Sequence, residues 1–397
     1  MNYSGMDYLR IDVANRYGKD KELFADRISW VHTNDYLLET LEDTADDYYQ
    51  YVAAVKAYRC AQAGNATGYL VGLDATASGP QLMSVITGCK VGAKHTNGIG
   101  QVRNDLYTAT TEAMRDILTD MGEYTRNDVK YALMPYFYGS TQEPKNVFGD
   151  DTEEYFAFMQ AANQVCPGAS MLLPVMLDMW DSTALKYCWD LPDGFQVRYM
   201  VKNKADTKIE VDTVEPHITF KYRREINTTL ERAAKIPANA IQSIDGYIVR
   251  ELTSRCNYNA NTLKAAKAVL RTIKDKPIAE YAFHEKAFRK HSALSLAGIE
   301  SLDINEYSYE YAQALIVLID QVLSKPSFEV LAIHDEFKAH PNNLNHVREV
   351  YRDILAELAD SNILNVILSD VTGYNVKIEK LSENLSDFIK TSEYAIC

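Results

Sequence analysis

Apolar residues recur at helical spacing over most of the chain. Near the amino terminus, Leu37 and Leu41 and then Val52 and Val55 are spaced as on one face of a helix, so the first ~65 residues are predicted to be mainly helical. Pro174 is expected to kink or divide a long helical stretch around it. The same spacing predicts further helices over 104–120, 128–137, 151–190, 240–253 and 261–274, with amphipathic helical segments over 276–324 and from 341 onward.

Two short apolar runs interrupt this pattern and predict buried strands. The first, Tyr69–Leu73, leads to Asp74, and the second, Phe328–Ile333, leads to His334 and Asp335. We expect the two strands to lie side by side in one sheet. Each would then present an aspartate at its end.

Turn residues and alternation supply the remaining elements. The turn at 78–80 predicts a helix that stops at Gly88. Alternating apolar positions from Phe195 to Val211, around a polar turn at 203–206, predict a β-hairpin. The expected fold class is therefore mainly α with a small antiparallel sheet, an α+β fold.

Composition places the chain among ordinary globular proteins. Apolar residues make up 47% and charged residues 24% of the 397 residues, and no apolar run is long enough to cross a bilayer. The amino terminus lacks a basic and then apolar signal pattern, so we expect a cytoplasmic protein without a membrane partner. The six cysteines form no CxxC pair, which argues against a zinc site or a disulfide framework.

The net charge of −14 argues against nucleic-acid binding over the whole surface, because neutralising phosphates requires Lys and Arg. Any path for nucleic acid must therefore be local, or supplied in part by another chain. The 27 tyrosines include candidates for base stacking, although core and surface packing explains most of them.

The aspartates at the two predicted strand ends suit divalent cations. Asp74 and Asp335 offer carboxylate oxygens, and the peptide carbonyl of Ala75 offers another ligand. Two Mg²⁺ ions roughly 4 Å apart, held in this way, support nucleotidyl transfer. A lone Asp at a strand end is more often an ordinary surface residue, so the pair gains its meaning only from the motifs around it.

One predicted helix carries two cations and a phenol near one face. Arg126 and Lys130 are four residues apart, and Tyr138 follows eight residues later, before Gly139. The cations suit a triphosphate, and the glycine permits the close approach of a template strand. An R-x-x-x-K spacing alone is more often a solvated helix surface.

Three segments in the right order resemble the single-subunit phage-type RNA polymerases. DATASGPQ, RNDVKYALMPYFYG and HDEF look like their motifs A, B and C, at residues 74–81, 126–139 and 334–337. The resemblance implies a right-hand palm and fingers, with two Mg²⁺ ions as cofactors. It also implies catalytic roles for Asp74, Asp335, Lys130 and Tyr138, phosphate binding by Arg126 and Lys130, and a test of the 2′-hydroxyl by Tyr138.

The choice between RNA and DNA synthesis depends on three positions. HDEF, with Glu336, is closer to the related DNA polymerases. In those enzymes a glutamate five residues after the metal-binding Asp acts as a steric gate against the 2′-hydroxyl of the nucleotide. In this chain Gly79 stands at that position of the nucleotide site. Met134 stands where they place an aromatic residue. We therefore expect ribonucleotides as substrates, with a family A-type DNA polymerase fragment as the alternative.

Several further segments extend the resemblance. The segment 195–224 corresponds to the specificity hairpin, where Lys221, Arg223 and Arg224 are candidate DNA contacts, although a plain solvated hairpin is equally compatible. His334 and Tyr107 are further candidates for nucleic-acid contact. The closing SEYAIC resembles the family's carboxy-terminal foot, although a frayed end is the default expectation for the last residues of a chain.

The resemblance also implies a domain plan. We expect a palm with upstream helices and motif A over 1–110, fingers with the motif B helix and the hairpin over 111–255, a helical insertion over 256–326, and motif C with terminal helices over 327–397. The helix around Asp245 keeps the Asp-Gly of a family element, but Tyr247 and Ile248 stand where a histidine is usual.

No DxxGR element occurs in the sequence, and in the family this element lies upstream, with the thumb and the amino-terminal domain. The chain in this respect resembles the larger subunit of the split, two-chain RNA polymerase of Enquatrovirus-type phages. We therefore expect a second subunit that carries the thumb and DxxGR, together with a DNA template, an RNA product and ribonucleoside triphosphates, in the cytoplasm of an infected host. A polymerase-like scaffold or nucleic-acid clamp without activity is the other alternative.

Overall fold

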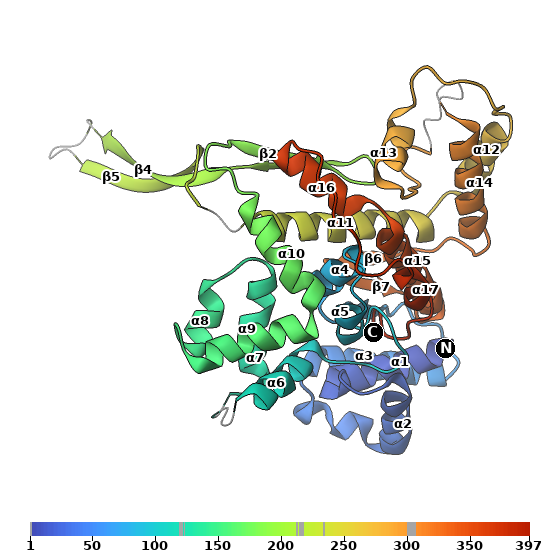
Figure 1. Ribbon diagram of the computed structural model, residues 1–397. Helices are drawn as coiled ribbons and strands as arrows, with labels where there is room; N and C mark the ends of the chain where they lie inside the picture. The colour runs from blue at the N-terminus through green and yellow to red at the C-terminus, as the bar shows by residue number, and fades with distance from the viewer. Residues whose placement is uncertain are drawn as a thin grey trace.

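A computed structural model describes residues 2–118, 122, 124–211, 213, 218–232, 235–299 and 307–397. About 56% of the structure is helical and the strands form small antiparallel sheets, which confirms the predicted mainly α architecture with a little β structure. Figure 1 shows the helices gathered around a short central sheet, with one long ribbon projecting from the body.

The central sheet has three antiparallel strands in the order β1-β7-β6. They are β1 (Val71–Asp74), β6 (Leu331–Ile333) and β7 (Glu336–Ala339). Asp74 pairs with Glu336 across β1 and β7, and Ile333 pairs with Glu336 across β6 and β7. The sequence suggested that the strand leading to Asp335 is the neighbour of β1. In the structure this strand, β6, does not pair with β1. β7, which the sequence analysis did not anticipate, lies between them.

The expected burial of the strand before Asp335 is also wrong. Leu331 is 51% exposed and Ile333 is 45% exposed, because β6 is an edge strand with β7 on one side only. His334 and Asp335 form the two-residue turn between β6 and β7, and His334 takes a left-handed φ of 57° there. This reversal presents Asp335 at a turn instead of at a free strand end.

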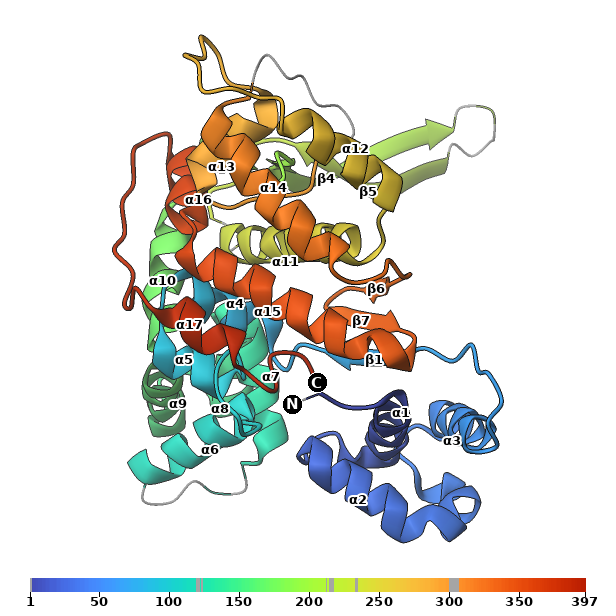
Figure 2. The ribbon, with the colours of Figure 1, turned by 90° about the vertical axis from the view of Figure 1, so that its right-hand side faces the viewer.

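Helices surround the sheet on both sides. The amino-terminal helices are α1 (Gly5–Ala14), α2 (Phe24–Asn34) and α3 (Tyr48–Gln62), with a π-helical turn at Asn15–Lys19 and short 3₁₀ turns at Asp35–Thr40 and Glu42–Thr44. The carboxy-terminal helices, preceded by a 3₁₀ turn at Pro341–Asn343, are α15 (Leu344–Asp360), α16 (Ile363–Thr372) and α17 (Leu385–Lys390). α1 contacts β1 and α15 contacts β7, so the two ends of the chain enclose the sheet (Figure 2).

A group of seven helices follows β1. They are α4 (Ser78–Ile86), α5 (Lys90–His95), α6 (Leu106–Ile117), α7 (Arg126–Phe137), α8 (Gln142–Phe148), α9 (Glu153–Val165) and α10 (Pro167–Asp178). Pro174 does not divide the predicted helical stretch, because it lies inside α10 and the division falls between Val165 and Pro167. Pro167 is tolerated there since the first turn of a helix needs no N–H donor from it.

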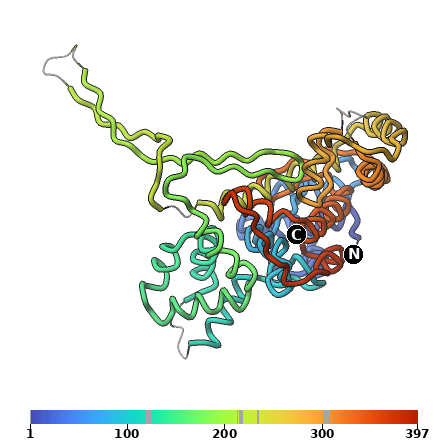
Figure 3. The backbone as a smooth tube through the Cα atoms, turned by 45° about the horizontal axis from the view of Figure 1, so that its top comes forward, coloured from blue at the N-terminus to red at the C-terminus, as the bar shows by residue number. Residues whose placement is uncertain are grey.

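Two β-ribbons replace the single hairpin that the sequence suggested. They are β2 (Lys186–Asp190) with β3 (Gln196–Met200), and β4 (Lys202–Val211) with β5 (Ile218–Asn227). The predicted turn at 203–206 is wrong, because these residues belong to β4 and pair with β5. Their polarity reflects exposure on both faces of a ribbon that extends from the body (Figure 3) and not a turn. Residues 186–190, predicted to be helical, form β2.

A second, smaller core lies in the region predicted as an insertion. α11 (Ile236–Cys256) leads into it, followed by α12 (Ala260–Leu270), α13 (Phe283–His291) and α14 (Tyr309–Leu323). Buried residues such as Leu263, Leu270, Tyr311 and Leu315 form a cluster separate from the main core. None of the helices in the described parts of the chain combines the length and apolar character needed to cross a membrane.

The carboxy-terminal segment 392–397 is an ordered part of the fold, so the default expectation of a frayed end is wrong. Cys397 N donates to Asp74 O at 3.0 Å, and Asp74 N donates to Cys397 O at 3.4 Å. The Tyr394 ring stacks on Phe24 with the ring centroids 4.8 Å apart. Gln81 Nε2 donates to Ala395 O at 3.1 Å. The segment therefore ties β1 and α4 to the amino-terminal helices.

Candidate active site

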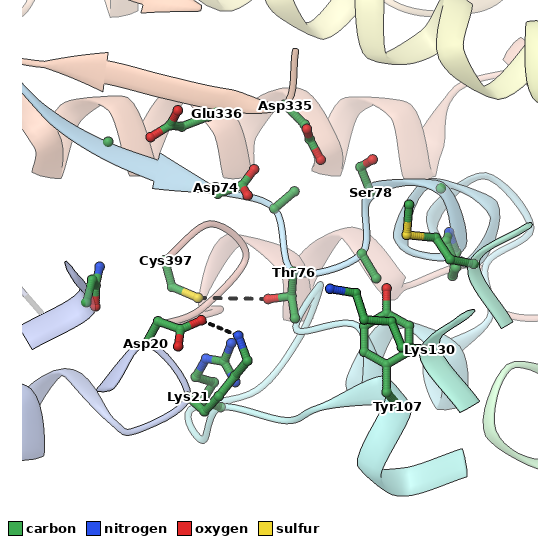
Figure 4. Close-up of a pocket in the computed structure, with 18 of the residues that line it drawn as sticks. Asp20, Lys21, Asp74, Thr76, Ser78, Tyr107, Lys130, Asp335, Glu336 and Cys397 are labelled. Carbon is green, nitrogen blue, oxygen red and sulfur yellow. Dashed lines mark hydrogen bonds and ion pairs between the residues drawn. The ribbon is translucent and has the colours of Figure 1, made fainter. Parts of the chain in front are cut away.

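Eight of the residues singled out from the sequence line one cleft of about 450 Å³ beside the central sheet. Figure 4 shows Asp74, Asp335 and Glu336 on one side of it and Lys130 and Tyr107 on the other. The eight residues are Asp74, Ala75, Gly79, Tyr107, Arg126, Lys130, Tyr138 and Asp335. Segments far apart in the sequence thus meet at a single site.

Asp74 ends β1 with its side chain open to the cleft. Desolvation, followed by the negative charges of Asp335 and Glu336, raises the pKa of its carboxyl to about 6. Lys21 and the Ala75 N–H act in the opposite direction. The net effect on Asp74 is a raised pKa, so desolvation and the neighbouring acids outweigh these opposing contributions.

The donor set fits a hard divalent cation. Asp74 and Asp335 supply carboxylate oxygens, as Mg²⁺ prefers, and Glu336 is opposite Asp74 in the strand register. In the described ranges no group of three or more His, Cys, Asp or Glu side chains is placed to hold an ion by itself. Mg²⁺ in nucleotide enzymes is usually bound through one or two carboxylates plus substrate phosphates, so a pair of carboxylates suffices.

The cations of motif B stand on the first turns of α7. Thr125 caps this helix, because its N–H donates to Asp128 Oδ2 at 2.8 Å and its hydroxyl accepts from Asp128 N. Arg126 Nε donates to Asp105 Oδ2 at 2.9 Å. The Arg126 guanidinium lies 5.2 Å and the Lys130 ammonium 5.9 Å from the centre of the Tyr107 ring.

The Tyr107 ring therefore packs against both cations of α7. The ring is buried, and the neighbouring groups Asp105, Tyr138 and Asp335 raise the pKa of its hydroxyl. Desolvation is the largest cause, and the pKa reaches about 12. The structure thus places Tyr107 under the basic face of α7, as a packing partner of the cations.

Tyr138 stands at the end of α7, where Gly139 turns the chain with a φ of 98°. The phenol is half-buried against the start of α4, beside Ser78 and Gly79. Burial raises its pKa, and the charges of Asp245 and Asp335 act in the same direction. A Cβ atom at Gly79 would overlap this phenol, so the absence of a side chain there makes room for Tyr138.

Some predicted residues do not line the cleft. His334 is exposed at the β6–β7 turn and Gly139 is buried behind Tyr138, and neither is part of the cleft lining. Lys221, Arg223 and Arg224 are exposed on β5 of the projecting ribbon. Arg223 pairs there with Asp206 at 2.8 Å.

The structure also brings in cleft residues that the sequence analysis did not select. Arg16, Asp20, Lys21, Arg103, Glu336 and Cys397 line the cleft. Arg16 is held by the buried Asp12 at 3.2 Å and reaches Glu336 at 3.8 Å. No motif pointed to Arg103.

Asp245 is a further acid near the site. Desolvation raises its pKa to about 7, with the Asp335 charge acting in the same direction and the Ser78 hydroxyl opposing it. Ser78 is also the hydrogen-bonding neighbour of Tyr138, so it lies between the acid and the phenol. The helix α11 thus delivers a carboxyl group behind Tyr138.

Comparison with known proteins shows a similarity over part of the chain. Residues 1–144 match the family model described as DNA-dependent RNA polymerase. This range includes Asp74 and the whole of α7, but not Asp335. No curated protein matches the chain. The match supports a DNA-directed RNA polymerase function, with a DNA template, an RNA product and nucleoside triphosphates as substrates.

Proposed function

We propose that this chain is the catalytic part of a DNA-directed RNA polymerase that extends RNA 3′ ends by two-metal nucleotidyl transfer. The observation that carries the proposal is the convergence of Asp74 and Asp335 with Arg126, Lys130 and Tyr138 on one cleft. Residues 1–110 and 327–397 would form the palm and residues 111–255 the fingers.

The acidic wall of the cleft suits the reacting end of the chain. Asp74 and Asp335 would hold two Mg²⁺ ions, which when bound lower the pKa of the attacking 3′-hydroxyl and support the departing pyrophosphate. The Ala75 carbonyl is available as a further ligand. Glu336 is restrained by Arg16 and Lys338, at 3.8 and 3.4 Å, and so is partly neutralised beside the pair.

The basic wall suits the triphosphate. Lys130 projects from the exposed face of α7 and Arg126 adds a planar fork of donors beside it. Both stand over Tyr107, which fixes the direction from which they approach the cleft. They would orient the α-phosphate for in-line attack, and positioning of this kind supplies most of the catalysis in phosphoryl transfer.

Tyr138 and Gly79 together support the choice of ribonucleotides. Gly79 occupies the place of a glutamate gate, and the Tyr138 phenol fills the adjacent space. A ribose 2′-hydroxyl would find a hydrogen-bonding partner there in place of a carboxylate side chain. A family A-type DNA polymerase remains the second candidate, favoured by Glu336, which faces Asp74 in the strand register.

We further propose that a second polypeptide completes the enzyme, as in split two-chain polymerases. The net charge of −14 leaves few cations for a long nucleic-acid path. Outside the cleft the exposed basic residues named above lie on the β4–β5 ribbon. A basic partner would supply the missing template surface, and charge complementarity would speed its association.

The test is extension of an RNA primer on single-stranded DNA by the chain alone and by the chain with its suspected partner. Asp335→Asn should reduce extension by at least ~1,000-fold, since it removes one of the two metal-binding carboxylates. Asp116→Asn, an exposed change on α6 away from the cleft, should leave extension unchanged. Extension that survives Asp335→Asn would contradict the two-metal assignment.

A second assay separates RNA from DNA synthesis. Tyr138→Phe removes the phenolic hydroxyl and keeps the ring that packs on Gly79. Competition between ribonucleotides and deoxyribonucleotides should then shift towards deoxyribonucleotides. Unchanged discrimination would remove the sugar-testing role from Tyr138, and preferential use of deoxyribonucleotides by the unmodified protein would favour the DNA polymerase alternative.

A further inference from the structure

Five cations line the cleft, and three of them already have a carboxylate partner. Arg16 pairs with Asp12, Lys21 with Asp20 and Arg126 with Asp105. Among the residues that the structure describes, Lys130 and Arg103 lie within ion-pair distance of no carboxylate. Lys130 belongs to the motif B helix and has a proposed ligand. Arg103 lies between motifs A and B, belongs to neither, and has none.

The loop that carries Arg103 is fixed to the catalytic strand. Asn97 is buried with a left-handed φ of 60°, and its Nδ2 donates to Thr76 Oγ1 at 2.9 Å and to Asn104 O at 2.9 Å. Asn104 N donates back to Asn97 Oδ1 at 2.6 Å. Thr76 is two residues after Asp74. Asn104, the residue next to Arg103, is therefore connected through the Asn97 side chain to the segment that follows Asp74.

The Arg103 side chain is recessed and incompletely bonded. Its Nε is shielded from solvent and has no hydrogen-bond acceptor in the described part of the chain. A buried donor without an acceptor costs free energy unless a ligand supplies one. A second guanidinium, that of Arg27, is fully buried close by, and the Arg103 charge contributes to lowering the pKa of Arg27 after the larger effect of desolvation.

Arg27 does not neutralise the charge of Arg103. Three of its donors are used by neutral acceptors, namely Asp20 O at 2.7 Å, Glu22 O at 2.9 Å and Asn15 Oδ1 at 2.8 Å, while Cys397 and Asp20 oppose the lowering of its pKa. These bonds fix the loop that presents Lys21 to the cleft. Two guanidinium groups of like charge are therefore held near one another, and an anion in the cleft would compensate both.

We propose that Arg103 binds the β- and γ-phosphates of the incoming nucleoside triphosphate and then the pyrophosphate that leaves. This inference rests on the proposed polymerase function and adds a residue outside the three motifs to the nucleotide site. Arg126 and Lys130 hold the triphosphate from α7, and Arg103 holds its far end from the loop before α6.

The recessed position favours a nucleotide over a nucleic-acid backbone. A template strand would run along the rim and would contact exposed cations, whereas the half-buried Arg103 lies in the lining of the cleft and would meet a ligand that enters it. A polyphosphate also carries the several charges that this group of cations requires. Arginine suits it because its planar fork of donors matches two phosphate oxygens at once.

The decisive experiment measures polyphosphate binding and kinetics on the full chain with its partner. Arg103→Ala should raise the KM for ribonucleotides and the inhibition constant of pyrophosphate by about 10- to 100-fold, as expected for loss of a charge-assisted contact. The kcat and the affinity for the primer–template should change much less. Arg103→Lys should recover part of the loss, because it restores the charge without the fork.

Controls separate this inference from the function on which it rests. Arg115→Ala, an exposed cation on α6 outside the cleft, should change neither constant. Calorimetric titration with tripolyphosphate tests the anion site without any catalysis. It is therefore informative even if the protein does not extend primers. A failure to extend primers would contradict the proposed function and not the anion site. Weaker tripolyphosphate binding by Arg103→Ala and by Arg103→Gln, with unchanged thermal unfolding, supports the inference. Equal binding by all variants, or a loss confined to primer–template affinity, overturns it.

Discussion

A Cβ atom built on Gly79 would lie 2.6 Å from Tyr138 Oη and 2.7 Å from Tyr138 Cζ. These two residues come from different motifs and different elements, α4 and the end of α7, yet a side chain added at Gly79 would have to displace Tyr138. Gly79 has no left-handed φ, so the requirement for glycine comes from the phenol and not from the backbone.

Gly79→Ala is therefore expected to displace Tyr138 from its place at the end of α7. We expect the KM for ribonucleotides to rise and discrimination against deoxyribonucleotides to change, with about 10-fold or greater loss of kcat/KM, since small misplacements of site residues are costly. Single-nucleotide incorporation measures both. Gly68→Ala is the matched control, because a Cβ there meets nothing within 4 Å and φ is not left-handed. Equal kinetics for the two variants would show that Tyr138 adapts freely.

The carboxy-terminal segment should be needed for catalysis as well as for stability. Cys397 pairs through both of its backbone groups with Asp74, and Ala395 accepts from Gln81 on α4. Removing residues 394–397 is expected to lower kcat by about 100-fold, because Asp74 loses the pairing that fixes its backbone. Primer–template binding, measured separately, should persist. A truncated chain with normal kcat and lowered thermal stability would restrict the segment to a structural role.

The motifs predicted the cleft better than the strands around it. Asp74, Arg126, Lys130, Tyr138 and Asp335 were selected through the resemblance of their three motifs to a known family, and they line one cleft. The pairing partner of β1 was not predicted, because β7 has only four residues and begins within the HDEF motif. Pairing partners of such short strands depend on the tertiary fold, which a local pattern does not encode.

Two other features had no signal in a single sequence. The long β4–β5 ribbon has polar residues on strand positions that usually indicate turns, since neither of its faces is buried in the body. Arg103 lies in an ordinary polar segment. Its candidate role in anion binding becomes evident only in the fold, where Arg27 and Thr76, from distant parts of the chain, lie near its loop. Both cases depend on neighbours remote in sequence.

His291 should make the fold sensitive to acid. It is fully buried on α13, neither ring nitrogen has a hydrogen-bond partner in the described residues, and desolvation lowers its pKa to about 4, with Lys290 lowering it and Asp190 raising it. The unfolded chain binds this proton near pH 6.5 and the folded chain only near pH 4. The contribution of neutral His291 is therefore complete above pH 6.5 and is lost as the pH falls towards 4, by up to ~3 kcal/mol.

The measurement for His291 is the free energy of unfolding between pH 4 and pH 7. His291→Leu should flatten the curve over this interval relative to the unmodified protein, because the titrating group is gone. His32→Gln, a change at an exposed histidine on α2, should leave the slope as it was. Parallel curves for all three proteins would mean that His291 is protonated in the folded state without cost.

Arg255 should be a costly ion-pair partner to remove. Its side chain is 4% exposed, and it donates to Glu251 at 2.8 Å and to both carboxylate oxygens of Glu357 at 2.7 Å, which joins α11 to α15. Arg255→Ala leaves the buried Glu251 without its cation and is expected to lower the free energy of unfolding by about 3–5 kcal/mol. Arg223→Ala breaks an ion pair whose two side chains are both 67% exposed, and is expected to cost about 0–1 kcal/mol. Denaturant unfolding of the two variants measures the difference, and a similar small loss for both would mean that Glu251 takes up a proton or water once Arg255 is gone.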